Sequence, residues 1–224
     1  MSYLPFANRV SAGQALGHAL QAWRGQDSPL VLALPRGGVP VAVEVAAALA
    51  ADLDVLIVRK LGTPGQPELA MGAIASGGVR VMNDDIVHTL GIPASAIERV
   101  ANAEMRELER RSAAYRGQRP PPVYAGRTLI LVDDGIATGA SIRAAIAALR
   151  LQDAARIVVA APVAPPETVA ALSREADAVV CLETPADFGS IGRFYRAFPQ
   201  LTDDEVRALL ARAWAPPRGG AEHT

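Results

Sequence analysis

The chain is poor in the residue types that several common classes of protein depend on. Its only cysteine is Cys181, so no disulfide can form within it, and no cysteine and histidine cluster has the spacing of a zinc site. No apolar run approaches the ~20 residues of a membrane span, and the N-terminus lacks the charged-then-apolar pattern of a signal peptide. We therefore expect a soluble cytoplasmic protein.

Basic residues are almost all of one kind, because 21 of the 22 are arginine and the exception is Lys60. We interpret Lys60 as a position that needs the compact ammonium group of lysine and not the guanidinium of arginine. The formal net charge is −1 and no basic block stands out, so we expect no nucleic-acid partner. With 224 residues, half of them hydrophobic, the chain can bury a sizeable core as one domain over 1–214, followed by a disordered tail at 215–224.

Short apolar runs alternate with longer helical patterns along the chain. The predicted strands lie at 30–34, 53–58, 129–132, 156–163 and 177–182, with a further short one at 79–82. The predicted helices lie at 7–23, 39–51, 84–115 with a break near 91–93, 141–151, 166–175 and 203–214. Such alternation predicts an α/β fold with a central parallel sheet flanked by helices.

Two stretches interrupt the alternation. Residues 61–78 hold so many glycines and prolines that we expect an irregular loop, the start of an insertion that runs to about 127. Residues 183–200 are predicted to form a small irregular hood that carries four of the aromatic side chains. These aromatics can stack on a flat heterocycle or form a local hydrophobic cluster. The helix at 94–115 is interpreted as structural, with Glu107 and Arg111 as a surface pair.

The stretch from Leu129 to Ser141 organises the chain. Four apolar residues predict a buried strand, and Asp133 and Asp134 stand where it ends. A turn of small residues then leads into a helix, and it offers hydroxyls and backbone N–H groups at that helix's N-terminus. A solvated turn and an ordinary helix cap explain each feature singly, but the combination suits a sugar phosphate.

A second anion cradle follows the first predicted strand. Residues 35–38, Pro-Arg-Gly-Gly, join this strand to the next helix, and the guanidinium of Arg36 suits a phosphate or pyrophosphate. The alternative is a cramped turn that needs glycine. Arg59 and Lys60 follow the strand at 53–58, and we expect them to point into the same crevice as Arg36 and Asp133 or to be solvated cations.

Three enzyme classes lack their motifs here. A P-loop nucleotide hydrolase needs a glycine-rich loop before its lysine, and Lys60 has none. No G-x-G-x-x-G follows a strand, which argues against a dinucleotide-binding fold. No G-x-S-x-G is present and no histidine lies near a serine motif, so a Ser-His-Asp hydrolase has little support.

The segment Val132 to Ser141 resembles the phosphoribosyl-pyrophosphate signature of the type I phosphoribosyltransferases over its whole length. Leu34 to Gly38 is similar to the pyrophosphate loop of that family, which implies an unusual peptide conformation, and Arg59-Lys60 is similar to its basic pair. With residues 62–68 and 185–188 included, the chain resembles a bacterial branch of phosphoribosyltransferase-like proteins.

This resemblance implies an Mg²⁺-dependent glycosyltransferase of the pentosyl class, acting in nucleotide metabolism. It would transfer ribose 5-phosphate from phosphoribosyl pyrophosphate to a nitrogenous, purine-like acceptor and release pyrophosphate. The implied catalytic residues are Asp133 and Asp134 on the ribose hydroxyls with Arg36 and Lys60 on pyrophosphate. Mg²⁺ would bridge pyrophosphate and ribose, with the two aspartates contributing indirectly. The implied substrate-binding residues are Gly37, Gly38, Arg59, Gly135, Ala137, Thr138, Gly139, Ala140, Ser141 and Phe188.

The acceptor is less well defined than the donor. The run from Pro185 to Tyr195 is loosely similar to the hood of the 6-oxopurine enzymes, in which a phenylalanine stacks on the base, but Arg193 and Arg196 replace the expected carboxylate. An anionic acceptor or one that is not a nucleobase therefore stays open. So do a non-catalytic regulator that binds phosphoribosyl pyrophosphate or a nucleotide, hydrolysis of a related sugar phosphate, and assembly as a homodimer.

Overall fold

A five-stranded parallel sheet forms the centre of the molecule, with strand order β2-β1-β6-β7-β8. The structure is a computed structural model, and it describes residues 5–215. The strands of this sheet are β1 (Leu30–Ala33), β2 (Asp52–Val55), β6 (Thr128–Val132), β7 (Arg156–Val163) and β8 (Ala178–Glu183). The predicted α/β class with a central parallel sheet is confirmed.

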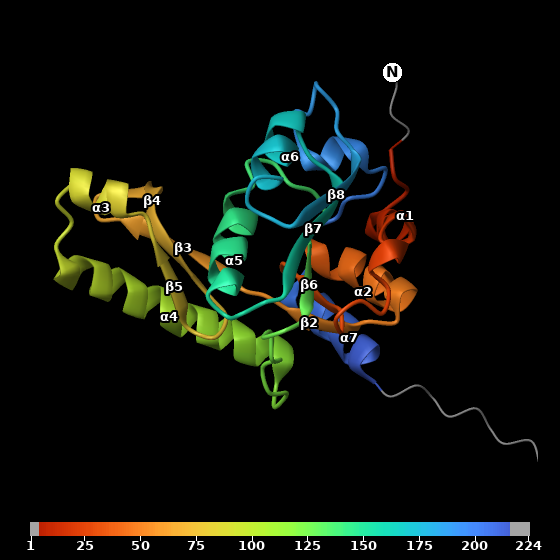
Figure 1. The fold of residues 1–224 in the computed structure, drawn as a ribbon, viewed down its shortest axis with the longest axis horizontal. Coiled ribbons are helices and arrows are strands. Elements are labelled where there is room, and N and C mark those ends of the chain that lie inside the picture. Colours follow the sequence, from red (N-terminus) through yellow and green to blue (C-terminus); the bar gives the residue numbers. More distant parts are fainter. Residues whose placement is uncertain (1–4, 216–224) are drawn as a thin grey trace, which may run out of the picture.

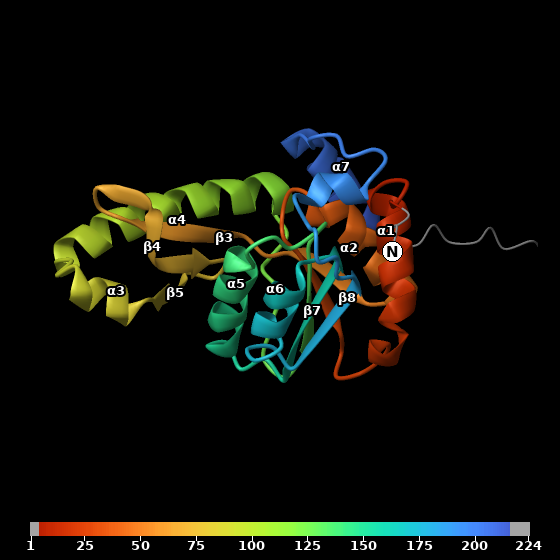
Figure 2. The same ribbon diagram turned by 90° about the horizontal axis from the view of Figure 1, so that it is seen from above.

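Helices cover both faces of the sheet (Figures 1 and 2). The helices on one face are α1 (Arg9–Ala19), α2 (Gly38–Leu49) and α7 (Asp203–Trp214), and those on the other are α5 (Ala140–Arg150) and α6 (Pro166–Leu172). In β1, Val31 and Ala33 belong to the first core while Leu30 and Leu32 belong to the second. This alternation is the period of two that a strand buried on both faces shows.

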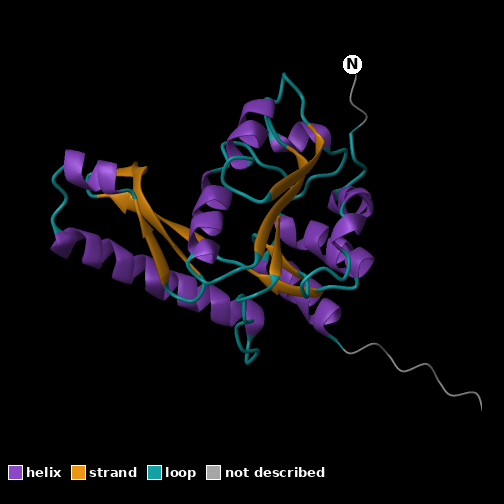
Figure 3. Cartoon of the chain, viewed as in Figure 1, coloured by secondary structure: helices purple, strands orange, loops and turns teal. Residues whose placement is uncertain are grey.

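A second unit extends from the parallel sheet as an arm (Figures 1 and 3). It is an antiparallel sheet packed against a long helix, and its elements are β3 (Val58–Thr63), β4 (Gln66–Ala75), β5 (Val79–Met82), α3 (Asp84–Thr89) and α4 (Ala94–Arg116). The short strand at 79–82 and the helix with its break near 91–93 are therefore confirmed. A buried ion pair between Arg116 and Asp54 of β2, with 2.7 Å between Nε and Oδ1, ties the end of α4 to the central sheet.

The prediction of an irregular loop at 61–78 was wrong, because these residues form the second half of β3 and the whole of β4. Glycine has two structural roles in this segment, in turns and within a strand, and the sequence alone does not distinguish either role from an irregular loop. Gly65 and Gly77 are turn residues with φ of 80° and 88°. Gly72 lies within a strand, where a Cβ would come 2.5 Å from the carbonyl oxygen of Val81 on the neighbouring strand.

The predicted strand at 53–58 is in fact two strands in two sheets. The chain leaves the parallel sheet after Val55, and β3 begins at Val58 and pairs with β4. The connecting residue Ile57 is buried and exchanges hydrogen bonds with Ser76, so the apolar run continues through the change of sheet. Arg59 and Lys60 therefore lie inside β3, in the arm, and not at the carboxyl end of a parallel strand.

The C-terminal part of the chain comprises the last helix, the hood and the tail that the sequence predicted. The predicted helix at 203–214 is α7, and it begins with a capping box formed by Thr202 and Glu205. The hood at 183–200 is irregular apart from the 3₁₀ helix η2 (Ile191–Phe194). Cys181 is half-buried in β8. Residues 216–224 of the predicted tail lie outside the described residues, and within these no helix is long and apolar enough to cross a membrane.

Candidate functional site

The strand order creates a crevice between β1 and β6. These strands are neighbours, but the chain continues from β1 through α2 to β2 on one side and from β6 through α5 to β7 on the other. Ligands of open α/β sheets bind at such a switch point, outside the carboxyl ends of the strands. The two predicted anion loops, 35–38 and 133–141, both start there, and the N–H of Leu34 donates to the carbonyl of Val132 at 2.9 Å.

The loop at 137–141 presents an exposed helix N-terminus, as expected for a phosphate cradle. The helix α5 begins at Ala140, and its N-cap Gly139 has a φ of 74°. The side chains of Thr138 and Ser141 are exposed. The hydroxyl of Thr168 donates to the carbonyl of Ala137 at 2.7 Å, which fixes the loop against α6. The first N–H groups of such a helix have no partner within it and can bind an anion. In this loop the N–H of Ala140 makes only a long hydrogen bond of 3.5 Å to the Thr138 hydroxyl.

Two carboxylates with different surroundings begin this loop. Asp133 lines a cavity of about 100 Å³, and its Oδ1 accepts the N–H of Asp134 at 2.9 Å. Burial and the neighbouring charge of Asp134 raise the pKa of Asp133 well above its usual range. Burial also raises the pKa of Asp134, which is 7% exposed, while the Arg9 guanidinium opposes that shift. Asp133 is thus the carboxylate that faces the cavity.

Arg9 of α1 is a functional candidate that sequence reasoning missed. Its Nε donates to Oδ2 of Asp134 at 2.7 Å and its Nη1 to the carbonyl of Pro199 at 2.8 Å. The guanidinium lies 3.8 Å from the ring centre of Phe198, and the Tyr195 hydroxyl donates to the backbone oxygen of Asp134 at 2.6 Å. Arg9 and Asp134 are 125 residues apart, and no local pattern indicates the contact.

The loop at 35–38 packs directly on the start of the aspartate loop. A Cβ on Gly38 would lie 2.6 Å from the carbonyl oxygen of Val132, and one on Gly37 would overlap the carboxylate of Asp134. The peptide bond between Pro35 and Arg36 is cis, in agreement with the unusual conformation that the resemblance implied. These glycines are therefore required by close approach of the two loops.

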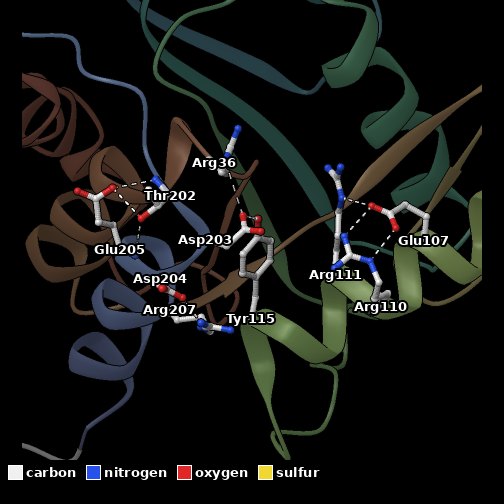
Figure 4. Close-up of polar contacts among 10 residues, drawn as sticks. All are labelled: Arg36, Glu107, Arg110, Arg111, Tyr115, Thr202, Asp203, Asp204, Glu205 and Arg207. Carbon is white, nitrogen blue, oxygen red and sulfur yellow. Dashed lines mark hydrogen bonds and ion pairs between the residues drawn. The ribbon is translucent and has the colours of Figure 1, made fainter.

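Figure 4 shows where the arm and the last helix meet, with Tyr115 of α4 against Asp203 of α7. Arg36 is half-exposed, and its Nη1 lies 4.0 Å from Oδ1 of Asp203 at the start of α7. Tyr115 of α4 donates its hydroxyl to the same carboxylate oxygen at 2.6 Å. Burial and this hydrogen bond raise the pKa of Tyr115 to about 12. Tyr115 and Arg111 line the cavity with Asp133 and Ser141, so α4 contributes side chains to the crevice in addition to its packing role.

The other predicted cations lie elsewhere. Arg59 forms an ion pair with Glu104 of α4, with 2.6 Å between Nη2 and Oε2. Lys60 forms one with Glu68 at 3.0 Å. Lys60 lines an adjoining groove of about 430 Å³ between the arm and α5, whose wall shares Val58 and Ser141 with the cavity. Neither cation is among the described residues that line the cavity with Asp133, so the expected common crevice was wrong for this pair.

The hood aromatics pack together. Phe188 stacks on Phe194 with 5.6 Å between ring centres, and both belong to a hydrophobic cluster with Tyr195 and Phe198. The local cluster that the sequence left open is therefore present. Phe188 remains half-exposed, so its predicted contact with an acceptor stays a prediction.

The donor set for a divalent cation is small. Within residues 5–215, no three His, Cys, Asp or Glu side chains gather as a metal centre. Mg²⁺ often keeps several waters and binds through one or two carboxylates together with substrate phosphates. Asp133 fits that mode because it faces the cavity, whereas Oδ2 of Asp134 is held by Arg9.

Comparisons with known proteins agree on one family. A family model described as a phosphoribosyl transferase domain matches residues 11–197. Two proteins of Mycobacterium tuberculosis, named "Putative phosphoribosyl transferase" Rv0571c (strain H37Rv) and MT0597 (strain CDC 1551), are 49% identical over 208 residues, 93% of this chain and 47% of each relative. The chain thus spans about half the length of these curated relatives. TT1426 from Thermus thermophilus is 43% identical, with a TM-score of 0.85 and coverage of 95% of this chain and 100% of that one.

Proposed function

The chain belongs to the phosphoribosyl transferase family, and on that basis we propose that it transfers ribose 5-phosphate from phosphoribosyl pyrophosphate to a nitrogenous acceptor. One observation carries the proposal: the exposed N-terminus of α5, the carboxylate of Asp133 and the loop of Arg36 converge at the switch point between β1 and β6. A sugar that carries a phosphate at one end and a pyrophosphate at the other needs these groups in this order.

Each half of the donor has its own residues in this proposal. The backbone N–H groups and hydroxyls of residues 137–141 bind the 5-phosphate. Asp133 accepts hydrogen bonds from the ribose hydroxyls, and Asp134 supports it from beneath the loop at 35–38. Arg36 and the backbone of Gly37 and Gly38 bind the pyrophosphate. Ionised acceptors and guanidinium donors make the stronger class of hydrogen bonds, so they orient the donor as well as bind it.

The reaction replaces one bond at C1 of the ribose by another. The C1–O bond to pyrophosphate breaks and its electron pair leaves with the pyrophosphate, while a lone pair of the acceptor nitrogen forms the new C1–N bond. That nitrogen then loses its proton to solvent. The contribution of this chain is to hold the reactants in line and to stabilise the charge that develops on the leaving group, which places most weight on the cations near pyrophosphate.

Mg²⁺ belongs to the proposal as a partner of the donor. When bound, it would neutralise part of the pyrophosphate charge, and Asp133 is the residue of this chain that would face it. The roles of Lys60, Arg59 and Phe188 in binding the substrates also stay proposals, since Lys60 and Arg59 are paired with Glu68 and Glu104 and do not line the cavity.

A non-catalytic sensor of phosphoribosyl pyrophosphate or a nucleotide is the second candidate. The observation that favours it is the pairing of Lys60 with Glu68 outside the cavity, which leaves the pyrophosphate side with fewer cations. The test is to incubate the protein with phosphoribosyl pyrophosphate, Mg²⁺ and a panel of purines, pyrimidines and anionic amines, and to measure pyrophosphate release. Turnover with one acceptor supports the transferase. Tight donor binding without turnover on any acceptor supports the sensor.

A further inference from the structure

The helix α4 places a cation on the wall of the central cavity. Arg111 lines this cavity together with Asp133 and Ser141, although it lies in the arm and not in the parallel sheet. Its side chain is 42% exposed, so a ligand can reach it. Tyr115, one turn further along α4, lines the same cavity. The face of α4 that carries these two residues is therefore part of the crevice.

Glu107 fixes the position of Arg111 without occupying its whole guanidinium. The Nε of Arg111 donates to Oε1 of Glu107 at 2.7 Å, and Arg110 donates to both oxygens of the same carboxylate at 2.8 and 2.9 Å. These hydrogen bonds lower the pKa of Glu107 to about 2, so it stays ionised. Within the described residues, the hydrogen bonds of Arg111 involve only Nε, which leaves its terminal nitrogens to a ligand.

Arg36 and Arg111 come from different elements, and the charge of each acts on Tyr115. Figure 4 shows the two arginines on either side of the Tyr115 ring. Both positive charges act on Tyr115, where they lower its pKa against the larger opposing effects of burial and Asp203. Arg36 is held by Asp203 only across 4.0 Å, so it also keeps donors for a ligand.

We propose that Arg111 binds the pyrophosphate group of the donor together with Arg36, so that α4 completes the site. This inference rests on the proposed function. A diphosphate carries several negative charges and presents oxygens to more than one guanidinium at a time. Lys60 is paired with Glu68 in the adjoining groove. Pro35 lines the cavity but its neighbour Arg36 does not, so Arg111 is the cation among the described residues that line it.

The test compares Arg111→Ala with Arg110→Ala by calorimetric titration of two ligands, inorganic pyrophosphate and ribose 5-phosphate. Arg110 is the matched control, because it lies on the same helix and shares Glu107 but does not line the cavity. We expect Arg111→Ala to weaken pyrophosphate binding by about 10- to 100-fold, as for a lost hydrogen bond to a charged group. Ribose 5-phosphate binding stays unchanged, and Arg110→Ala binds both ligands like the wild type. Arg111→Lys keeps the positive charge but loses the planar guanidinium that can donate two parallel hydrogen bonds. We expect this variant to bind pyrophosphate with intermediate affinity.

Two results overturn this inference alone, given a wild-type protein that binds both ligands. In the first, Arg111→Ala binds pyrophosphate as tightly as Arg110→Ala does. In the second, Arg111→Ala loses both ligands equally, which points to a general effect on the fold. A wild-type protein that binds neither ligand overturns the proposed function, and this inference with it.

Discussion

Replacing Arg9 by methionine leaves the Asp134 carboxylate buried without its cation. Methionine keeps most of the apolar stem of arginine, so the change removes charge and hydrogen bonds more than packing. The side chains of Arg9 and Asp134 are each 10% exposed, and their ion pair is 2.7 Å long. The variant also loses the hydrogen bond to Pro199 and the contact with the Phe198 ring.

The expected cost follows from this burial. Removing one partner of a buried ion pair costs about 3–5 kcal/mol, because the remaining charge is uncompensated. The loss of the cation–π contact adds about 2 kcal/mol, because the guanidinium is largely desolvated. The total is a large part of the ~5–15 kcal/mol by which domains are stable. Asp134→Asn removes the charge itself, so in the double variant the cost of Arg9→Met should fall by roughly 1–3 kcal/mol.

The pH dependence has a definite sign. Burial raises the pKa of Asp134, and Arg9 opposes that shift. Arg9→Met therefore raises the pKa of Asp134 in the folded protein further above its pKa in the unfolded chain. The folded variant then binds a proton that the unfolded chain releases, and its deficit in stability grows as the pH rises and shrinks as it falls. The assay is urea unfolding of wild type, both single variants and the double variant, at neutral and mildly acidic pH. A cost below ~1 kcal/mol for Arg9→Met, or additivity within ~0.5 kcal/mol, would refute the reasoning.

Three further predictions concern residues of the core and the site. Asp133→Asn should raise the melting temperature at neutral pH, because the raised pKa of Asp133 means that its ionisation opposes folding, and it should weaken binding of phosphoribosyl pyrophosphate by about 10- to 100-fold. Gly38→Ala should cost about 1–3 kcal/mol in urea unfolding, because its Cβ would lie 2.6 Å from the Val132 carbonyl oxygen. Burial raises the pKa of the Cys181 thiol to about 11, so iodoacetamide should modify it slowly in the folded protein and faster in urea.

Each of these has an outcome that contradicts it. A lower melting temperature for Asp133→Asn means that the carboxylate stabilises the fold instead of costing stability. An unchanged urea midpoint for Gly38→Ala means that the two loops are not in close contact. Modification of Cys181 at the rate of a free thiol, with the fold intact, means that the side chain is more accessible than in the structure.

Local patterns predicted most of the central sheet and half of the site. The strand ending at Val132, the aspartates after it and the helix N-terminus at Ala140 are consecutive in sequence, so composition and spacing define them. The position of the loop at 35–38 beside the aspartate loop followed from the rule that parallel strands present their carboxyl ends at one edge of the sheet.

The rest of the site depends on long-range packing that periodicity does not show. Arg9 reaches Asp134 across 125 residues, and Arg111 reaches the cavity because α4 crosses back to the central sheet from the arm. The predicted position of Lys60 was wrong for a related reason. The apolar run around Ile57 is buried in both sheets, so the hydrophobic pattern does not mark the point at which the chain passes from one to the other.

The central claim is that the crevice between β1 and β6 binds a phosphoribosyl donor in two halves. Calorimetric titration of the wild-type protein with phosphoribosyl pyrophosphate and Mg²⁺ tests it most directly, with Asp133→Asn as the comparison. We predict saturable binding at one site per chain, competition by both pyrophosphate and ribose 5-phosphate, and much weaker binding to Asp133→Asn. No binding to the wild type, or equal binding to the variant, would contradict the claim.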